Sequence, residues 1–391
     1  MQTLKSDFSS KIKIITPDDG YHYFFAYYDM RATGDGINQN HLCHRVKFMD
    51  RLPQKDDVCE VGYLVDNKFY KIGETTAWNF QQGAMLQYHP FKEDTVYYNV
   101  VKDGKFTTVT HNFTSGEKLY TDMPTACVSP DGKYGLSVNF GRIFAFRAGY
   151  GYAGCIDKNA SVNAPADDGV FLTDMQSGKS KLLVSYQNLL KESGFSSKDK
   201  ILVNHITFNT TSNKYVMLVR NFPTSGYMWS TSMMIGDLNG NFKTILKNTY
   251  VSHYKWLSSN EILAHCNVTK DKLIKNLYLI NVEDGSIKQY DSFYYHIDGC
   301  NPDIHCTQTP DGKYFIGDGY PYDGYRGILV TEISTLKSKV ILWAKTVIPN
   351  SEDIRCDLHA RYVFNDKYVS FDTTHNGKRE IAIFPIEEVK V

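Results

Sequence analysis

The chain has 391 residues, 42% of them hydrophobic, so it is long enough for one large domain or two ordinary ones with a substantial core. Its 43 basic and 43 acidic residues leave no net charge, which argues against nucleic acid or an anionic membrane surface as a ligand. The 28 Tyr, 22 Phe and 28 Gly favour many short strands joined by tight turns, and hence an all-β protein.

The N-terminal segment MQTLKSDFSSKIKIITPDDG has no apolar core of signal-peptide length, and no later segment approaches the roughly 20 apolar residues of a membrane span. We therefore expect a soluble protein. Its eight cysteines are scattered without a CxxC pair, which favours buried free thiols in a reducing compartment. Together these features predict a cytoplasmic location.

A turn followed by a strand recurs four times along the chain. The copies are DGKYGLSVNF from Asp131, SNKYVMLVRN from Ser212, DGKYFIGDGY from Asp311 and NDKYVSFDTT from Asn365. Short apolar runs broken by DG, SG or NG follow them and fit antiparallel hairpins. Such internal similarity predicts a repeat architecture.

Seven units of this kind can be placed along the chain. Their inner turns fall near residues 35, 93, 131, 212, 259, 311 and 365, at roughly the 40–55 residue spacing of propeller blades. We predict a single domain over residues 1–391, a seven-bladed β-propeller of four-stranded antiparallel blades. The segment KIKIIT near the start is expected to pair with the last blade and close the ring.

One interval between turns is much longer than the others. It contains GRIFAFRAGYGYAGCIDKNASVNAPADDG, which is rich in Gly, Ala and aromatic residues and lacks strand alternation. We interpret residues 141–168 as an insertion lying over one face, where long loops often carry function. A short helix is expected over residues 186–197.

Histidines recur at one position of the repeat, eight or nine residues before the repeated lysine, at His205, His305 and His359. Because the first strand of each blade lines a propeller's channel, we expect these side chains near one mouth of it. Asp357 lies two residues before His359, and strand geometry would put both on the same side. His305, Asp357 and His359 form a mixed nitrogen and oxygen set suited to Mn²⁺, Zn²⁺ or a similar divalent ion.

Each of these assignments has a structural alternative. A single histidine before a strand is more often a hydrogen-bonded core residue, and Asp357 could simply fix a turn. Recurrence within the repeat favours metal or substrate contact for His305 and His359. His205 could be a third ligand, or a base with a pKa near neutrality.

Two aromatic and polar segments could shape the rest of a pocket. ETTAWNFQQGAMLQYHP combines Trp78 with the amides of Gln81 and Gln82, which suits a sugar ring and its hydroxyls. The alternative for this segment is a packed interface between blades. GDGYPYDGYRG includes Asp318 and Tyr320 and is expected to form a loop on the rim, where Tyr320 could contact substrate.

The stretch DIHCTQTPDGKYFIGDG, with DLHARYVFNDKYVSFDTTHNGKREIAIF later in the chain, resembles the oligogalacturonate lyases, most clearly over residues 200–390. The resemblance implies a seven-bladed propeller with a Mn²⁺ site in its channel. His305 and His359 fall on metal-binding histidines of that family, and Asp357 stands at the first histidine of its HxH motif. His205 falls on a histidine that the family uses for acid/base chemistry.

The chemistry of uronates explains what such a site requires. A cation on the carboxylate lowers the free energy of the enolate-like anion formed when the C5 proton is removed. A base then starts elimination of the O4-linked sugar, and His205 is our candidate. Arginines would hold or neutralise the carboxylate; we favour Arg220 as a catalytic group and Arg361 as a substrate-binding one. The other candidates are Arg142, Arg147 and Arg355.

The sequence therefore favours a metal-dependent lyase acting on small uronate-containing oligosaccharides, with no nucleic acid or membrane partner. Two alternatives stay open. One is a carbohydrate-binding propeller without catalysis, for which the aspartate at position 357 is the argument. The other is a glycoside hydrolase using paired carboxylates such as Asp303 and Asp357.

Overall fold

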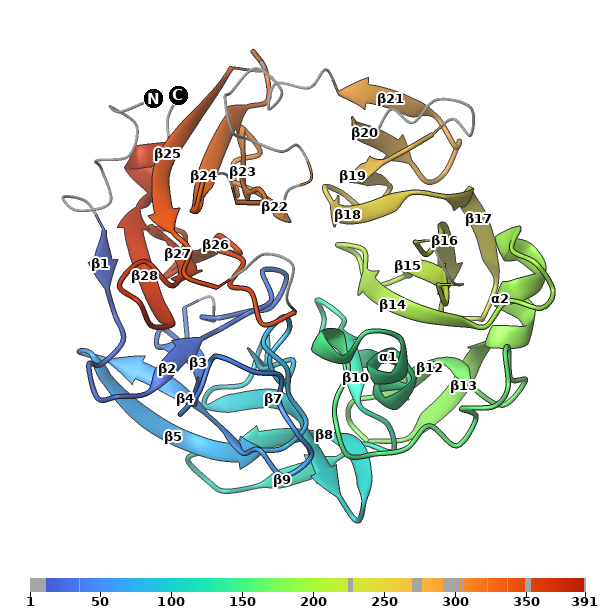
Figure 1. Ribbon diagram of the computed structural model, residues 1–391, viewed down its shortest axis with the longest axis horizontal. Coiled ribbons are helices and arrows are strands. Elements are labelled where there is room, and N and C mark those ends of the chain that lie inside the picture. Colours follow the sequence, from blue (N-terminus) through green and yellow to red (C-terminus); the bar gives the residue numbers. More distant parts are fainter. Residues whose placement is uncertain are drawn as a thin grey trace. The chain divides into compact units, whose positions relative to one another are not determined.

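The computed structural model describes residues 12–34, 36–223, 228–268, 276–290, 303, 305–321, 323–335, 337–348 and 353–389. Its strands form seven four-stranded antiparallel sheets (Figure 1). These sheets are the blades of a seven-bladed β-propeller, which confirms the fold predicted from the repeats. The chain divides into two compact units, with residues 1–98, 112–116 and 291–391 in unit 1 and residues 99–111 and 117–290 in unit 2.

Unit 1 contains three complete sheets. The first consists of β2 (His22–Phe24), β3 (His41–Val46), β4 (Cys59–Val65) and β5 (Lys68–Thr75). The second consists of β22 (His305–Gln308), β23 (Tyr314–Asp318), β24 (Tyr325–Glu332) and β25 (Ser338–Lys345). The third has the order β1 (Lys13–Ile14), β28 (Glu380–Pro385), β27 (Tyr368–Thr373) and β26 (Arg361–Val363), and a short 3-10 helix (Ile386–Val389) follows it.

The predicted pairing of the N-terminal strand with the last blade is confirmed. β1 lies antiparallel to β28, with Lys13 opposite Ile383 and Ile14 opposite Ala382. One sheet of unit 1 therefore joins strands from the two ends of the chain (Figure 1).

Unit 2 also contains three complete sheets, and a further sheet has residues in both units. The first sheet of unit 2 consists of β10 (Thr125–Val128), β11 (Tyr134–Ser137), β12 (Gly169–Asp174) and β13 (Ser180–Ser185). The second consists of β14 (Ile201–Phe208), β15 (Lys214–Asn221), β16 (Thr231–Asp237) and β17 (Phe242–Thr249). The third consists of β18 (Val251–Trp256), β19 (Glu261–Cys266), β20 (Asn276–Asn281) and β21 (Ile287–Tyr290). The divided sheet consists of β6 (Gln87–Tyr88), β7 (Thr95–Lys102), β8 (Lys105–Asn112) and β9 (Lys118–Tyr120).

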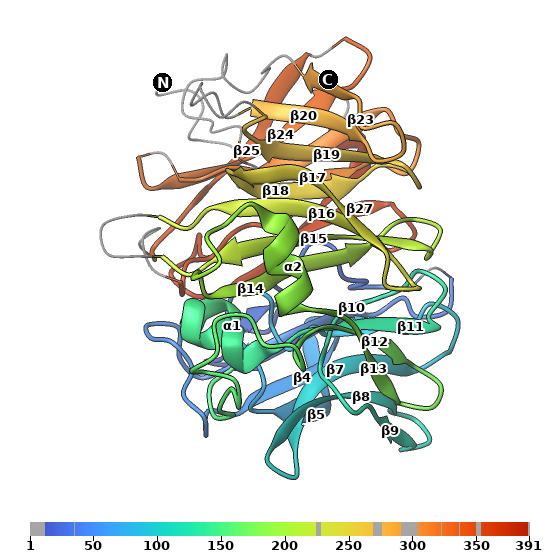
Figure 2. The same cartoon turned by 90° about the vertical axis from the view of Figure 1, so that its right-hand side faces the viewer.

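The long interval between β11 and β12 holds an insertion, as predicted, and it includes the unpredicted helix α1 (Phe140–Phe146) and a 3-10 turn (Ala148–Tyr150). α1 packs against β14, and α2 (Tyr186–Ser193) lies against β13, β14 and β17 (Figure 2). α2 falls within the predicted helix but ends earlier, because Gly194 adopts a left-handed conformation at its C-terminus.

A buried arginine anchors the insertion. The Arg142 guanidinium donates to the carbonyl oxygens of Ile201 (2.7 Å) and Asn163 (2.6 Å) and lies 3.2 Å from an Asp157 carboxylate oxygen. Arg142 is fully buried in unit 2. These contacts correct its interpretation as a candidate substrate ligand, because its donors are used within the protein.

The repeated turn is explained by its aspartate and glycine. The Asp131 carboxylate accepts hydrogen bonds from the Ser129 hydroxyl (2.6 Å) and the Lys133 N–H (3.2 Å), and Gly132 has φ of +69°. The copy at Asp311 makes the matching bonds to Thr309 and Lys313. An aspartate that caps the turn and a glycine at positive φ are what a tight hairpin requires. The predicted turn near residue 35 includes a position outside the described residues.

The core of each unit is apolar and formed by facing sheets. In unit 1, buried residues of β23, β24, β27 and β28 form one cluster that includes Ile316, Val330 and Phe371. In unit 2, a corresponding cluster joins β15 and β16 with β18 and β19. The seven cysteines among the described residues are free, as predicted; Cys300 lies outside these residues. Among the described residues, no helix is long and apolar enough to span a bilayer.

Candidate metal centre

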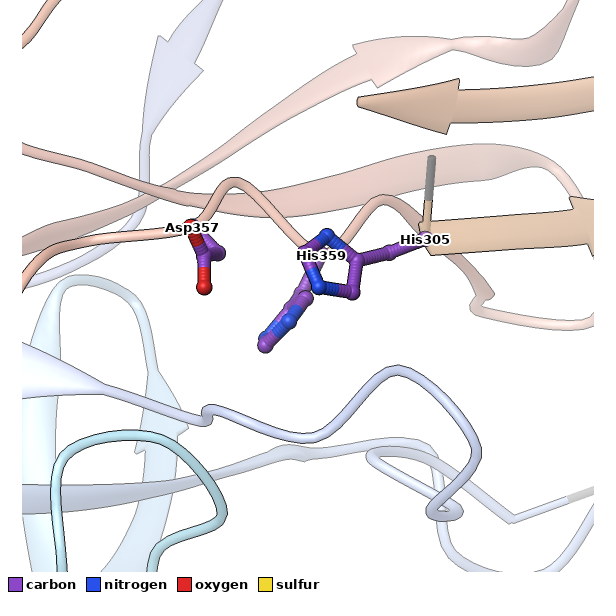
Figure 3. A group of neighbouring side chains, drawn as sticks. All are labelled: His305, Asp357 and His359. Carbon is purple, nitrogen blue, oxygen red and sulfur yellow. The ribbon is translucent and has the colours of Figure 1, made fainter. Parts of the chain in front are cut away.

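Side chains from two distant segments of the sequence, one with His305 and the other with Asp357 and His359, converge in unit 1 (Figure 3). His305 begins β22, and Asp357 and His359 lie in the segment that leads into β26. One nitrogen or oxygen of each residue lies within 4.8 Å of the others, and all three residues are buried. The predicted grouping of His305, Asp357 and His359 is therefore present within one unit, whereas His205, which the repeat also pointed to, belongs to unit 2.

Each imidazole is held through its Nδ1 atom. Nδ1 of His305 lies 3.1 Å from Oδ1 of Asp318, and Nδ1 of His359 lies 2.6 Å from the carbonyl oxygen of Ala26. Because an ionised carboxylate and a carbonyl only accept hydrogen bonds, Nδ1 carries the proton in both rings. In a neutral ring with the proton on Nδ1, Nε2 keeps its lone pair, which is the arrangement in which histidine binds a metal ion. The centres of the His305 and His359 rings are 4.2 Å apart, and the ring planes are nearly perpendicular.

The protonation states of the ligand candidates also suit a cation. Burial, together with the neighbouring His305, lowers the pKa of His359 to about 3, so this imidazole is neutral near neutral pH. Burial alone would raise the pKa of Asp357, but Arg355 and Arg326 hold it well below its usual range. Asp357 is therefore a carboxylate. Neutral imidazole and ionised carboxylate are the metal-binding forms of these side chains.

The two oxygens of Asp357 have different surroundings. Nη2 of Arg326 lies 2.8 Å from Oδ1, and Nε of Arg355 donates to the same oxygen at 3.2 Å. Arg355 Nε is also 3.1 Å from Oδ2, but within the described part of the chain Oδ2 accepts no hydrogen bond of acceptable geometry. A buried oxygen without a hydrogen bond is a strong candidate ligand atom, since leaving it unsatisfied costs about 1–3 kcal/mol. These donors fit Mn²⁺, Zn²⁺ or a similar divalent ion.

Sequence reasoning placed one residue of this site wrongly. Asp318 was expected in a rim loop, whereas it is fully buried at the end of β23 and lies opposite His305. Its second oxygen accepts the Leu358 N–H at 2.7 Å, so Asp318 joins the two segments that carry the ligand candidates. The sequence did contain a signal for this position of Asp318. Thr309 and Tyr314 face each other across the hairpin turn, and counting outwards from them along both strands pairs residue 305 with residue 318.

Other residues of the site were not predicted at all. Arg326 on β24 contacts Asp357, donates to the Gly319 carbonyl oxygen at 2.6 Å and is almost completely buried. The Tyr28 ring is 5.6 Å from the His305 ring and 5.4 Å from the His359 ring. Tyr28 follows β2 and limits the space in which both imidazoles can rotate.

Arg361 lies close to the site but its guanidinium is used within the protein. Nη2 contacts Oδ1 of Asp372 at 2.5 Å, Nε donates to Ser370 Oγ at 3.0 Å, and Nη1 donates to the His359 carbonyl oxygen at 3.0 Å. These contacts and its burial correct the prediction that Arg361 binds substrate directly. They support instead a role in positioning the segment that carries His359.

The segment with Trp78, Gln81 and Gln82 matches the packing alternative. Trp78 is 1% exposed, and its indole N–H donates to the Asp57 carbonyl oxygen at 2.8 Å. Gln81 Nε2 donates to the carbonyl oxygens of Asp353 (2.9 Å) and Arg355 (3.0 Å). Gln81 thereby fixes the segment before Asp357, and the buried Gln82 lies in the same interior turn. A sugar contact by Trp78 is contradicted by its burial.

We expect Trp78→Ala to lower the free energy of unfolding by about 3–5 kcal/mol, the usual cost of truncating a buried aromatic residue. Trp78 packs against Phe24, Phe48 and Phe80, and alanine would leave a cavity between these rings. Urea unfolding of the two proteins measures the difference. Trp78→Phe is the matched control, and its free energy of unfolding should fall much less. Equal stability of the alanine variant and the wild type would contradict the packing role.

Tyr320 is half-buried after β23, and the Arg326 guanidinium lies 5.8 Å from the centre of its ring. This position is compatible with the predicted substrate contact, which stays a prediction.

The predicted catalytic residues belong to unit 2. His205 on β14 is half-buried, and its ring meets that of Tyr150 edge to face at 6.0 Å. Arg220 on β15 is buried and donates to the side-chain oxygen of Asn204 at 2.6 Å. The half-buried guanidinium of Arg147 lies 4.5 Å from the Tyr150 ring centre. The catalytic roles of His205 and Arg220 stay predictions.

Comparison with known proteins supports the propeller. No protein-family model matches the chain, and no curated protein sequence matches it. Oligogalacturonate lyase from Vibrio parahaemolyticus is similar in structure, with a TM-score of 0.68 and 14% identity, over 99% of this chain and 96% of that one. A prolyl endopeptidase (TM-score 0.56, 8% identity) and the tricorn protease (TM-score 0.54, 11% identity) are also similar, over 95% and 97% of this chain. The matches cover 49% and 34% of those longer chains. At these identities the likeness shows the fold alone.

Proposed function

We propose that this protein is a metal-dependent lyase that cleaves small uronate-containing oligosaccharides, such as oligogalacturonates, by β-elimination. The observation that carries the proposal is the buried group of His305, Asp357 and His359, with both imidazoles held through Nδ1. The structural similarity to an oligogalacturonate lyase over nearly the whole of both chains supports the same conclusion. We propose Mn²⁺ as the ion, in line with the sequence resemblance to that family.

The residues of unit 1 would prepare the site for an anionic sugar. A divalent ion held here would neutralise the uronate carboxylate and so favour loss of the C5 proton. Asp318 and Ala26 keep the two imidazoles in the tautomer that exposes Nε2. Arg326 and Arg355 keep Asp357 ionised and fix its position. Tyr28 restricts both rings.

We assign removal of the C5 proton to His205, because a neutral imidazole can accept a proton near neutral pH. Arg220 is the candidate for neutralising charge during the reaction. His205→Asn should lower kcat by about 10²–10⁴-fold, the usual contribution of a general base, without changing the metal content. Steady-state kinetics and elemental analysis of the same preparation test both statements. A kcat close to that of the wild type would remove His205 from the mechanism.

The proposed activity is tested with oligogalacturonate as substrate. Elimination creates a double bond conjugated with the carboxylate, so ultraviolet absorbance should rise on mixing. A chelator should abolish the rise, and added Mn²⁺ should restore it. Reducing sugar released without an increase in absorbance would indicate a hydrolase and would contradict the proposal.

A binding protein without catalysis is the second candidate, and the contacts of Asp357 favour it. Two buried arginines neutralise this carboxylate, which weakens its attraction for a cation. Calorimetric binding of oligosaccharide without any unsaturated product on long incubation would support this candidate. The hydrolase alternative has less support, since a general acid needs a raised pKa and that of Asp357 is strongly lowered.

A further inference from the structure

Two non-glycine residues with left-handed backbone face each other at the candidate metal centre. His359 has φ of 46° and Ala26 has φ of 76°, and the hydrogen bond from His359 Nδ1 to the Ala26 carbonyl oxygen joins them. Such conformations cost of order 1–3 kcal/mol each and persist only where the surroundings enforce them. Something must therefore hold the backbone at Ala26, which follows β2, whereas His359 precedes β26 of a different sheet.

Asp372 on β27 is the residue that holds this backbone. Its carboxylate accepts the N–H groups of Phe25 (3.1 Å) and Ala26 (2.7 Å) on one side and contacts the Arg361 guanidinium (2.5 Å) on the other. The carboxylate is buried. These bonds fix the two peptide groups that precede the Ala26 Cα atom, and the carbonyl of the next peptide group meets His359 Nδ1.

Arg361 completes the arrangement from the other side. Its Nη1 atom donates to the carbonyl oxygen of His359 at 3.0 Å and lies 3.4 Å from that of Ala26. The ion pair of Asp372 and Arg361 thus contacts both partners of the Ala26–His359 hydrogen bond. His305 differs, because its Nδ1 is bound directly by the carboxylate of Asp318.

We propose that Asp372, together with Arg361, is a positioning residue that sets the tautomer and orientation of His359 through the backbone of Ala26. As far as it concerns metal binding, this inference rests on the proposed function. The groups that orient a metal-binding histidine typically change metal affinity by about 10–100-fold when they are altered. A purely structural ion pair would change stability and leave metal affinity and the state of the ring unchanged.

The experiment uses the full chain and two measurements. Calorimetric titration with Mn²⁺ alone gives the metal affinity, and NMR of ¹⁵N-histidine-labelled, metal-free protein reports the Nδ1–H of His359, assigned with His359→Gln. We expect Asp372→Asn to weaken Mn²⁺ binding by about 10–100-fold and to reduce the Nδ1–H population of His359. Glu60→Gln is the control, because it removes a carboxylate from the Arg45 ion pair of the same unit.

A second variant covers failure of Asp372→Asn to fold. Arg361→Lys keeps a positive charge opposite Asp372 but loses the fork of donors to the two carbonyls, and it should change both measurements in the same direction. The positioning role is overturned if the folded variants match Glu60→Gln in Mn²⁺ affinity and in the His359 signal. If the wild type binds no Mn²⁺ but the variants still alter the His359 signal, the proposed function fails and the positioning of His359 stands.

Discussion

Replacing His359 with alanine should abolish stoichiometric binding of a divalent metal ion by the purified protein. The substitution removes one of the three grouped donors and the ring that Ala26 orients. Loss of a metal-binding side chain should reduce metal affinity at least as much as loss of a group that orients it. We therefore expect the affinity for the metal ion to fall by about 100-fold or more. Elemental analysis and calorimetric titration with Mn²⁺ measure the effect, and lyase activity should be lost with the metal.

The control for this variant is His375→Ala. His375 is a half-buried histidine of the same unit, and its Nδ1 accepts the Lys345 N–H at 3.1 Å. It should keep the metal content of the wild type. Unchanged metal content in His359→Ala would mean that the buried group is not the binding site, and the proposed lyase chemistry would lose its basis.

Replacing Arg326 with methionine should lower the free energy of unfolding by about 3–5 kcal/mol, because it breaks a buried ion pair and leaves a charge behind. Arg326 is 1% exposed and contacts Asp357, and its Nη1 lies 3.9 Å from Asp318. The same change should strengthen binding of a divalent ion, since it removes a positive charge next to the carboxylate. Stability and metal affinity would therefore move in opposite directions.

Denaturant unfolding with and without Mn²⁺ tests this expectation, because an ion that binds only the folded state stabilises it by mass action. Mn²⁺ should recover more stability in the Arg326 variant than in the wild type. Arg45→Met is the matched control, because Arg45 pairs with Glu60 in the same unit and this change should leave the stabilisation by Mn²⁺ as in the wild type. Weaker Mn²⁺ binding in the folded Arg326 variant would contradict this expectation, and would show that fixing Asp357 matters more for cation binding than the nearby positive charge.

The fold could be predicted from sequence because its signal is local and repeated. The copies at Asp131 and Asp311 carry a capping aspartate of their own, and seven inner turns at blade-like spacing give the number of blades. The short helix α1 was missed because seven residues of mixed aromatic and small type have no clear period. The Asp318 side chain was placed on the rim because the strand β23 runs further than its GDG sequence indicated.

The candidate site was only partly predictable, for a physical reason. The histidines recur within the repeat and could be found, whereas the groups that orient them share no pattern. Asp318 lies on the strand next to His305, but Ala26, which orients His359, follows a strand of another sheet. Ala26 is the clearest case. Glycine and asparagine mark left-handed positions in a sequence, but an alanine held there by a distant carboxylate gives no such signal. Arg326 likewise looks like an ordinary strand residue in the sequence, because its contact with Asp357 depends on where β24 lies in the fold.

The contact between Ala26 and His359 also constrains when the centre can form during biosynthesis. The two residues are 333 positions apart. At a synthesis rate of about 5–20 residues per second, the ribosome needs roughly 15–70 s to reach His359 after it has added Ala26. Throughout this interval the nascent chain lacks the imidazole and the carboxylate that hold the early turn. Loading with an ion at this centre must therefore wait until His359 has been synthesised.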